Sequence, residues 1–200
     1  LLISTGTWSV SLNPHSEKSI TDDIDSINYM QINGEIVKAS RLFLGNEYML
    51  QIEKLDKLFR VDFDYHKSLA FDYNVYTKVS DDFKYHFMWE SIEDEDMPNQ
   101  TNYNFKDYNH AYHQLMTELV LLQIKSIKKA IGEQKIKRLY IDGGFSDNNL
   151  FIKLITHHLP KKKNKNNRCL FRLSTWCSYC HIRHKTELKI FKGEFLIKKT

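Results

Sequence analysis

The sequence predicts an α/β fold, and three features carry that prediction. The chain opens with a short apolar strand, a glycine turn and a returning strand whose side chains alternate, Trp8-Ser-Val-Ser-Leu12. A long amphipathic segment, from about 107 to 131, predicts a packing helix. An apolar run, Lys137-Arg-Leu-Tyr-Ile141, then leads through two glycines into a further helical segment. Helix, strand, glycine turn and helix in this order are typical of α/β proteins.

The composition limits the class of protein. The chain has 200 residues, of which 42% are hydrophobic and 27% charged, which excludes collagen-like, mucin-like and wholly disordered proteins. It has no apolar run long enough to cross a membrane and no basic N-terminal segment, so we expect no membrane partner and a cytoplasmic location. Because the chain opens on Leu1 rather than Met, we expect it to be a fragment.

The charge divides the chain into two parts. Residues 161–200 hold 12 basic and 2 acidic side chains, whereas residues 1–160 have a net charge of −6. All three cysteines, Cys169, Cys177 and Cys180, also lie after residue 160, so the first part has no disulfide framework and suits a reducing compartment. We therefore expect one domain over 1–160 and a separate basic tail over 161–200.

The elements of the first part follow in order. Residues 1–5 and 8–12 predict a hairpin around Gly6-Thr7, and residues 26–32 and 35–40 predict a second hairpin around Asn33-Gly34. Apolar residues at helical spacing predict a helix over 41–59, although Gly45 weakens its middle. We interpret residues 62–104 as a solvated excursion, because they combine short aromatic runs with an acidic stretch, 90–96.

The last elements of the first part have clearer boundaries. In the helix over 107–131, two lysines occupy the last turn and Gly132 follows as a stop signal. The strand over 137–141 comes next, and a second helix is predicted from about 146 to 157.

Two glycine turns have a composition that suits ligand binding. At Thr5-Gly6-Thr7 the backbone can approach an anion while hydroxyl and N–H groups donate to it, as a phosphate requires. At Gly143-Gly144 a strand ends in two residues without side chains just before a helix, so a flat ligand can lie against bare backbone. An ordinary hairpin turn and an ordinary strand-to-helix turn remain the alternatives, but together the two motifs favour a nucleotide.

Three segments at these turns resemble a known family. They are Leu2-Ile-Ser-Thr-Gly-Thr-Trp-Ser-Val-Ser-Leu-Asn13, Lys38-Ala-Ser-Arg-Leu-Phe-Leu-Gly-Asn-Glu47 and Tyr140-Ile-Asp-Gly-Gly-Phe-Ser-Asp-Asn-Asn-Leu-Phe151. In this order they are similar to the C-terminal domain of the FGGY carbohydrate kinases, most of all the branch that handles rhamnulose or fuculose type sugars. The resemblance covers roughly residues 1–160.

This resemblance implies an actin-like, ribonuclease H-like ATPase half-domain. Such kinases transfer the γ-phosphoryl group of ATP, which carries Mg²⁺, to a sugar hydroxyl in a cleft between two domains. Matched position by position, Thr5, Gly6 and Thr7 are the implied phosphate-binding residues, and Gly143, Gly144 and Asn148 the implied adenosine-binding residues. We expect no protein metal site, because positioning and charge stabilisation suffice for phosphoryl transfer.

The resemblance also implies what this chain lacks. The family's catalytic base is an Asp in the N-terminal kinase domain, which also holds most of the contacts to the sugar, a deoxyketose or a similar substrate. No acidic residue here matches that base, so we assign no catalytic residue. We expect the isolated chain to have little or no activity without an N-terminal kinase domain as partner.

After Pro160 the resemblance ends, and three interpretations of the tail stay open. Cys177-x-x-Cys180-His181 satisfies the haem c attachment pattern and, with Cys169 and His184, could supply zinc ligands. The basic charge with Trp176 could bind nucleic acid, a partner that we do not expect. The interpretation that we favour is a tail translated out of frame, because shifting the frame allows a Gly-Ala-Ala-Ile-Ala helix. The alternative function is a non-catalytic nucleotide-binding or interaction domain whose tail binds zinc or nucleic acid.

Overall fold

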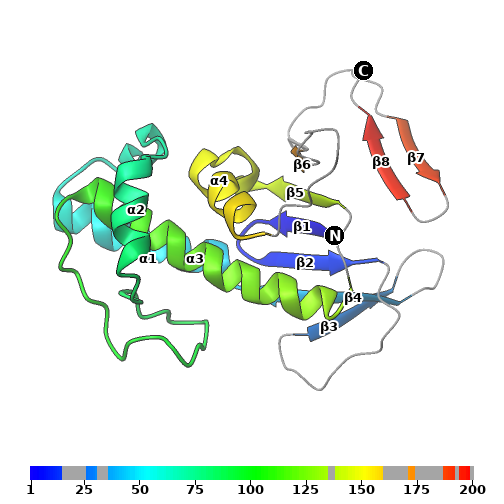
Figure 1. Cartoon of the computed structure of the whole chain (residues 1–200), viewed down its shortest axis with the longest axis horizontal. Helices are drawn as coiled ribbons and strands as arrows, with labels where there is room; N and C mark the ends of the chain where they lie inside the picture. Colours follow the sequence, from blue (N-terminus) through cyan, green and yellow to red (C-terminus); the bar gives the residue numbers. More distant parts are fainter. Residues whose placement is uncertain are drawn as a thin grey trace.

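A computed structural model describes residues 1–14, 26–30, 36–134 and 138–159, together with three later strands at 171–173, 187–191 and 194–198. Its centre is a six-stranded sheet in the order β3-β4-β2-β1-β5-β6 (Figure 1). The strands are β1 (Leu2–Thr5), β2 (Ser9–Asn13), β3 (Ser26–Met30), β4 (Ile36–Leu42), β5 (Leu139–Gly143) and β6 (Phe171–Leu173). Strands β1 to β4 pair antiparallel, and β5 and β6 run parallel to β1. The predicted α/β class is thus confirmed as a mixed sheet with helices.

Both predicted hairpins form. Thr5 lies opposite Ser9 at the end of the first hairpin, as the Gly6-Thr7 turn predicts. In the second, β3 and β4 pair from Ser26–Ser40 to Met30–Ile36. The Asn33-Gly34 turn itself lies outside the described residues. Two further strands, β7 (Glu187–Phe191) and β8 (Glu194–Lys198), pair antiparallel within the tail.

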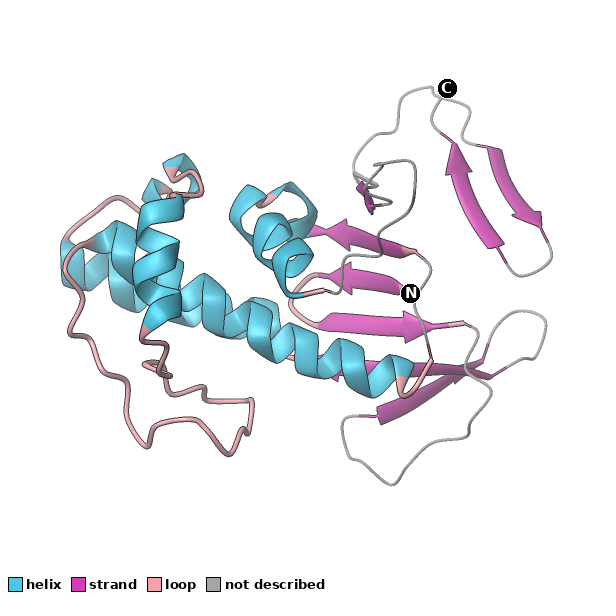
Figure 2. Cartoon of the chain, in the orientation of Figure 1, coloured by secondary structure: helices cyan, strands magenta, loops and turns pink. Residues whose placement is uncertain are grey.

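The helices end where local signals stop them. They are α1 (Leu44–Phe59), α2 (Tyr73–Asp81), α3 (Tyr108–Ile131) and α4 (Asn149–His158), with short 3₁₀ turns η1 (Tyr65–Ser68) and η2 (Gly144–Asp147) (Figure 2). Asp107 caps α3 by accepting a hydrogen bond from the His110 N–H at 2.8 Å. Gly132 ends it at a φ of 57°, a conformation that favours glycine.

The long helix α3 crosses one face of the sheet and contacts it through polar side chains. The Ser9 hydroxyl donates to Gln123 Oε1 at 2.5 Å, and Gln123 Nε2 donates to the Ser11 hydroxyl at 3.0 Å. Ser126 donates to Ser40 across the same interface, also between buried side chains. Because every strand alternates, Val10 and Leu12 lie on the opposite face and are only half-buried. This interface is therefore held by matched hydrogen bonds as well as by apolar contact.

The interpretation of residues 62–104 as a solvated excursion is wrong for its central part. Phe87 and Trp89 are buried in the hydrophobic core beside α3. The segment has little regular structure after α2, but buried carboxyl groups accept hydrogen bonds from its backbone. Glu47 of α1 accepts the N–H groups of Glu90 and Ser91, at 3.1 and 2.5 Å, and Glu118 of α3 accepts two more. These partners pack an acidic, aromatic segment against the core. Because they lie far away in the chain, the local sequence does not indicate this packing.

Three predicted boundaries shift. Helix α1 begins at Leu44 rather than at 41, because β4 continues through Leu42 against Ser9. Strand β5 extends to Gly143, and η2 precedes α4. Helix α4 therefore begins three residues later than predicted.

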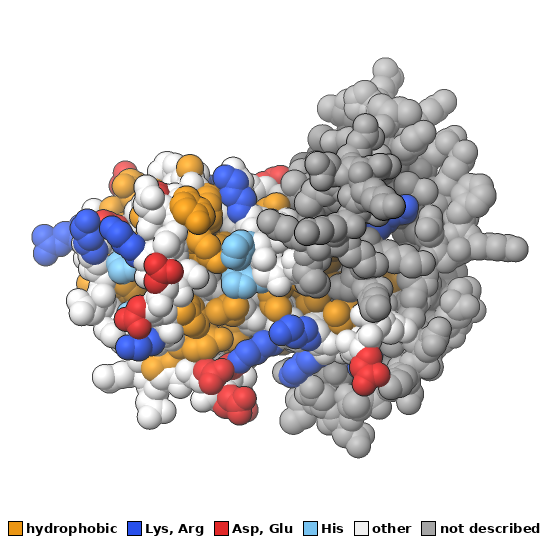
Figure 3. Space-filling view, viewed as in Figure 1, with side chains coloured by type: hydrophobic (Ala, Val, Ile, Leu, Met, Phe, Trp, Pro, Cys, Tyr) orange, Lys and Arg blue, Asp and Glu red, His pale blue; other side chains and the backbone are white. Residues whose placement is uncertain are grey.

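The surface carries both signs of charge. On the face viewed in Figure 1, acidic and basic side chains are interspersed over the described residues (Figure 3). Among the described residues, no helix is both long and apolar enough to cross a membrane.

Candidate functional site

The two glycine turns singled out in the sequence lie at the same edge of the sheet. Strands β1 and β5 are parallel neighbours, and their last residues, Thr5 and Gly143, are direct partners. The turn after β1 and the turn after β5 therefore leave the sheet side by side (Figure 1). In open α/β sheets this carboxyl edge is where ligands usually bind.

The tip of the first hairpin rests on the beginning of α1. The Thr7 carbonyl accepts hydrogen bonds from the N–H groups of Gly45 and Asn46, at 3.1 and 3.2 Å. It thereby satisfies backbone donors of the first helical turn, where the Phe43 cap residue offers no side-chain acceptor. A Cβ atom on Gly45 would lie 2.0 Å from the Gly6 carbonyl oxygen, so this contact requires glycine. From the sequence alone, Gly45 is expected only to lower the stability of the helix.

Gly6 and Thr7 themselves are exposed at this tip. The Gly6 N–H donates to the Trp8 carbonyl at 2.9 Å, which closes the turn. Within the described part of the chain, the Thr7 hydroxyl has no hydrogen-bond partner. Of the three residues predicted to bind phosphate, Thr7 is thus the one whose side chain is available to a ligand.

Thr5 is placed differently from its two neighbours. It is only 3% exposed, and its hydroxyl donates to the Asp142 carbonyl at 2.5 Å. The same oxygen accepts the Phe145 N–H at 3.1 Å. The Thr5 side chain therefore joins β1 to both sides of the Gly143-Gly144 turn.

The two adjacent glycines, Gly143 and Gly144, differ in what the fold asks of them. Gly143 has a φ of 88°, and a Cβ there would lie 1.8 Å from the Thr5 carbonyl oxygen. The fold therefore excludes any side chain at Gly143. At Gly144 the backbone is not in the left-handed region, and a Cβ would meet no atom within 4 Å. No described neighbour explains why Gly144 lacks a side chain.

Asn148 is held by the fold at both ends of its amide. Its Oδ1 accepts the Phe151 N–H at 3.0 Å and so caps α4, while its Nδ2 donates to the Tyr112 hydroxyl at 3.0 Å. Asn148 thus lies at the helix start that follows the Gly-Gly turn, but its polar atoms are engaged within the chain.

A buried aromatic layer supports the turn from below. The Phe145 ring packs edge-on against Tyr48, with ring centroids 5.1 Å apart. It also packs at a tilt against Phe151, with ring centroids 4.7 Å apart. The Tyr48 and Tyr112 hydroxyls lie 3.4 Å apart, and burial raises the pKa of both phenols above the usual range. These tyrosines therefore stay neutral and act as packing and hydrogen-bonding groups.

An aromatic side chain beside the hairpin tip escaped the sequence analysis as a site residue. Trp8 is 44% exposed and packs on Phe43 with ring centroids 4.5 Å apart. The Arg41 guanidinium carbon lies 5.1 Å from the centre of the Trp8 ring. The sequence predicts Trp8 as the first residue of a strand, but β2 begins at Ser9. The feature that could have marked Trp8 is a large aromatic residue directly after the Gly6-Thr7 turn.

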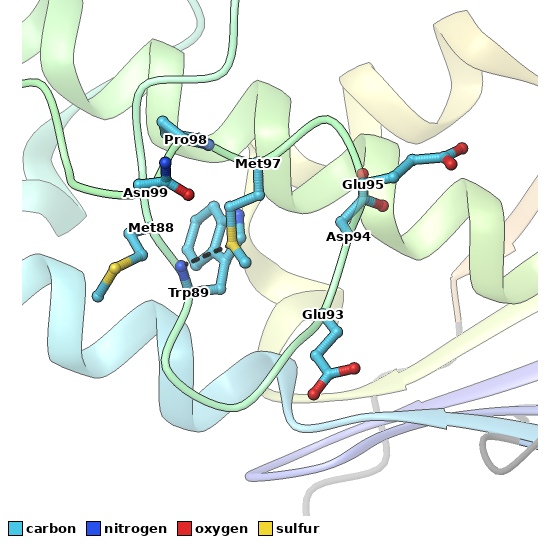
Figure 4. Close-up of a pocket in the computed structure, with 8 residues that line it drawn as sticks. All are labelled: Met88, Trp89, Glu93, Asp94, Glu95, Met97, Pro98 and Asn99. Carbon is cyan, nitrogen blue, oxygen red and sulfur yellow. Dashed lines mark hydrogen bonds between the residues drawn. The ribbon is translucent and has the colours of Figure 1, made fainter.

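A shallow hollow of about 650 Å³ lies elsewhere in the molecule, between residues 88 and 99 (Figure 4). Its walls include Met88, Trp89 and Met97. The backbone N–H of Trp89 donates to the Met97 sulfur, with 3.0 Å between nitrogen and sulfur. One acidic residue of its rim, Asp94, binds Lys125 at 2.7 Å. The hollow is thus separate from the glycine turns.

Side chains able to bind a metal ion do not cluster within the described residues. Among the residues that the structure describes, no group of three or more His, Cys, Asp or Glu side chains could hold a metal ion. The proposed tail ligands Cys169, Cys177, Cys180, His181 and His184 lie outside the described residues.

Comparison with known proteins gives a structural match only. No family model matches the sequence, and no curated protein matches it either. Among solved structures, a carbohydrate kinase from Novosphingobium aromaticivorans superposes with a TM-score of 0.51 and 15% identity, over 78% of this chain and 34% of the kinase. The chain thus spans about a third of that kinase. The match shows that this chain has a carbohydrate-kinase-like fold.

Proposed function

We propose that residues 1–160 form the nucleotide-binding half of an ATP-dependent carbohydrate kinase of the FGGY type, with an actin-like fold. The reaction would transfer the γ-phosphoryl group of ATP to a sugar hydroxyl, with a deoxyketose as the substrate class. The fold shared with a carbohydrate kinase supports this at a coarse level. A catalytic base and most sugar contacts would come from an N-terminal kinase domain, so this chain alone would not catalyse the transfer.

The observation that carries the proposal is the contrast between Gly143 and Gly144. Gly143 is glycine for the sake of the fold, since any side chain would collide with Thr5. Gly144 has open space where its side chain would lie. Glycine in such a position lets a ligand approach the backbone closely. The flat adenine ring of adenosine, placed against the Gly144 backbone, would explain why this position is a glycine, which packing within the chain does not explain.

The hairpin tip supports the phosphate side of the same proposal. Gly6 and Thr7 are exposed at the sheet edge where Gly144 also lies, and the Thr7 hydroxyl can donate to a phosphate oxygen. Phosphoryl transfer is catalysed mainly by positioning and charge stabilisation. ATP bound here would carry Mg²⁺, which would supply positive charge against that of the phosphates. This chain's own residues would orient the phosphates and hold the adenosine.

The experiment compares Gly144→Val and Gly144→Ala with the unmodified chain in ATP binding, by calorimetry with Mg²⁺ present. Valine fills the open space, so we expect ATP affinity to fall at least about tenfold, and alanine to have a smaller effect. The thermal unfolding midpoint should change little, because a Cβ at this exposed position meets no neighbouring atom within 4 Å.

Ala70→Val is the matched control, because it adds bulk at an exposed position in another segment. It should leave ATP affinity unchanged. Unchanged ATP affinity in a folded Gly144→Val protein would contradict the adenosine assignment. Absence of ATP binding by the unmodified chain at millimolar nucleotide would contradict the proposed function as a whole.

A further inference from the structure

The Thr5 hydroxyl is fully used within the fold. It donates its one proton to the Asp142 carbonyl at 2.5 Å and accepts the Phe145 N–H at 3.1 Å. A hydroxyl has a single proton to donate, and a phosphate oxygen is an acceptor. Binding phosphate through Thr5 would therefore require breaking the bond to Asp142. With only 3% of the residue exposed, Thr5 also offers a ligand little surface.

The same residue is interlocked with the glycine turn through its backbone. Gly143 lies against the Thr5 carbonyl so closely that a Cβ would sit 1.8 Å from that oxygen. The Ser146 hydroxyl donates to the Gly143 carbonyl at 2.7 Å and holds the turn from its far side. The Gly143-Gly144 turn is thus clamped between Thr5 and Ser146.

We propose that Thr5 is a positioning residue that holds the Gly143-Gly144 turn in the conformation that meets adenosine. It sets how Gly144 presents its backbone to adenosine, whereas the phosphates meet Gly6 and Thr7. This inference rests on the proposed function, but it changes one role expected from the sequence. Thr5 aligns the adenosine-binding turn instead of contacting phosphate, and Thr7 remains as the side-chain phosphate donor.

The two roles of Thr5 predict different losses of affinity. A phosphate ligand contributes to ATP binding and nothing to adenosine binding, because adenosine has no phosphate. A positioning residue acts on the turn that meets the adenosine, so its loss weakens ATP and adenosine by the same factor. The ratio of the two affinities therefore separates the roles, whatever the absolute affinity is.

The experiment measures ATP and adenosine affinities of Thr5→Val and Thr5→Ser by competition against a fluorescent ATP analogue. Valine keeps the branched shape but removes the hydroxyl, whereas serine keeps the hydroxyl. We expect Thr5→Val to weaken both ligands about tenfold, because two hydrogen bonds to the turn are lost, and Thr5→Ser to restore most of the affinity. The Phe145 amide should exchange hydrogen faster in the valine variant.

Gln123→Ala is the control for a merely structural effect. It removes the bonds to Ser9 and Ser11 in the adjacent strand but touches neither glycine turn. We expect this variant to be destabilised yet to bind both ligands as before. Equal loss in Gln123→Ala and Thr5→Val would mean that general destabilisation explains the effect, and would overturn the inference.

Two other outcomes would also overturn it. A loss confined to ATP would make Thr5 a phosphate ligand, and unchanged affinities in Thr5→Val would deny it any role in binding. If the unmodified chain binds neither ligand, the proposed function fails and the positioning role of Thr5 fails with it. Faster exchange at Phe145 would then show that the hydroxyl contact exists without serving a nucleotide.

Discussion

Replacing Glu118 by glutamine should remove the contribution that we expect this residue to make to the pH dependence of the free energy of unfolding. Glu118 is completely buried on α3. Its Oε1 accepts the His86 N–H and the Gln114 amide, both at 2.7 Å, and its Oε2 accepts the Phe87 N–H at 3.2 Å. Burial raises the pKa of this carboxyl to about 8, although the three donors act in the opposite direction. The proton on Glu118 is thus linked to folding.

The magnitude follows from the interval between the two pKa values. In the unfolded chain Glu118 loses its proton near its ordinary pKa of 4.5, whereas the folded protein keeps it up to about 8. Since the folded state binds more protons across this window, stability falls as the pH rises through it. Each pH unit contributes about 1.4 kcal/mol, so the loss reaches at most about 5 kcal/mol. Glutamine cannot ionise, although its amide nitrogen cannot accept the N–H group that one carboxyl oxygen accepts.

The assay is chemical denaturation of wild type and Glu118→Gln, followed by circular dichroism from about pH 5 to about pH 9. The variant should be the less stable protein at the acidic end, where it lacks one accepted hydrogen bond, and it should gain stability relative to wild type toward the alkaline end. Burial lowers the pKa of His66 and His113, but these groups affect both proteins alike, so the difference between the curves isolates Glu118. Parallel curves would refute the reasoning, and so would a wild type that gains stability over the variant as the pH rises.

Two further variants test a contact of the hairpin tip and the polar contacts on the covered face of the sheet. Gly45→Ala should destabilise the protein by about 1–3 kcal/mol despite the better helix propensity of alanine, because its Cβ would lie 2.0 Å from the Gly6 carbonyl oxygen. A stability equal to or above wild type in thermal unfolding would contradict that contact. Gln123→Ala should cost about 2–4 kcal/mol, since it leaves the Ser9 and Ser11 hydroxyls buried without this partner. The exposed Lys128→Ala on the same helix serves as its control, and equal effects of the two would count against the buried polar interface.

Elements with local signals could be predicted from the sequence. The helix α3 was found within one residue at its start because Asp107 supplies a cap and apolar residues recur at helical spacing. Its end was found because Gly132 tolerates the backbone conformation needed there. The first hairpin was likewise marked by Gly6 between two short strands. In each case the residues that decide the structure are close together in the chain.

Features that depend on distant partners could not be predicted in this way. Alternation in β2 would ordinarily place Val10 and Leu12 against the core, but Ser9 and Ser11 face α3 because Gln123, more than a hundred residues later, satisfies both hydroxyls. The buried segment around Phe87 looked solvated because its anchors, Glu47 and Glu118, belong to helices on either side of it in sequence.

The candidate site shows the same division. Its glycine turns could be predicted as turns, and a resemblance pointed to their ligand, yet nothing in the sequence distinguishes Gly143 from Gly144. Only the three-dimensional neighbours separate them, because one glycine abuts the Thr5 backbone and the other faces open space. Trp8, exposed beside the hairpin tip, was assigned to a strand since nothing local marks its exposure.

The polar sheet–helix interface favours one register of the strands. A slip of β2 by one residue would turn Val10 and Leu12 toward Gln123 and leave buried amide groups without partners. Apolar residues on that face would tolerate such a slip more easily, since apolar contact is not directional. The correct register places Ser9 opposite Thr5 and so sets the hairpin tip directly after the residue that clamps Gly143. The side-chain hydrogen bonds on the covered face thus select the register, and the backbone pairing of β1 with β2 and β5 then aligns the two turns.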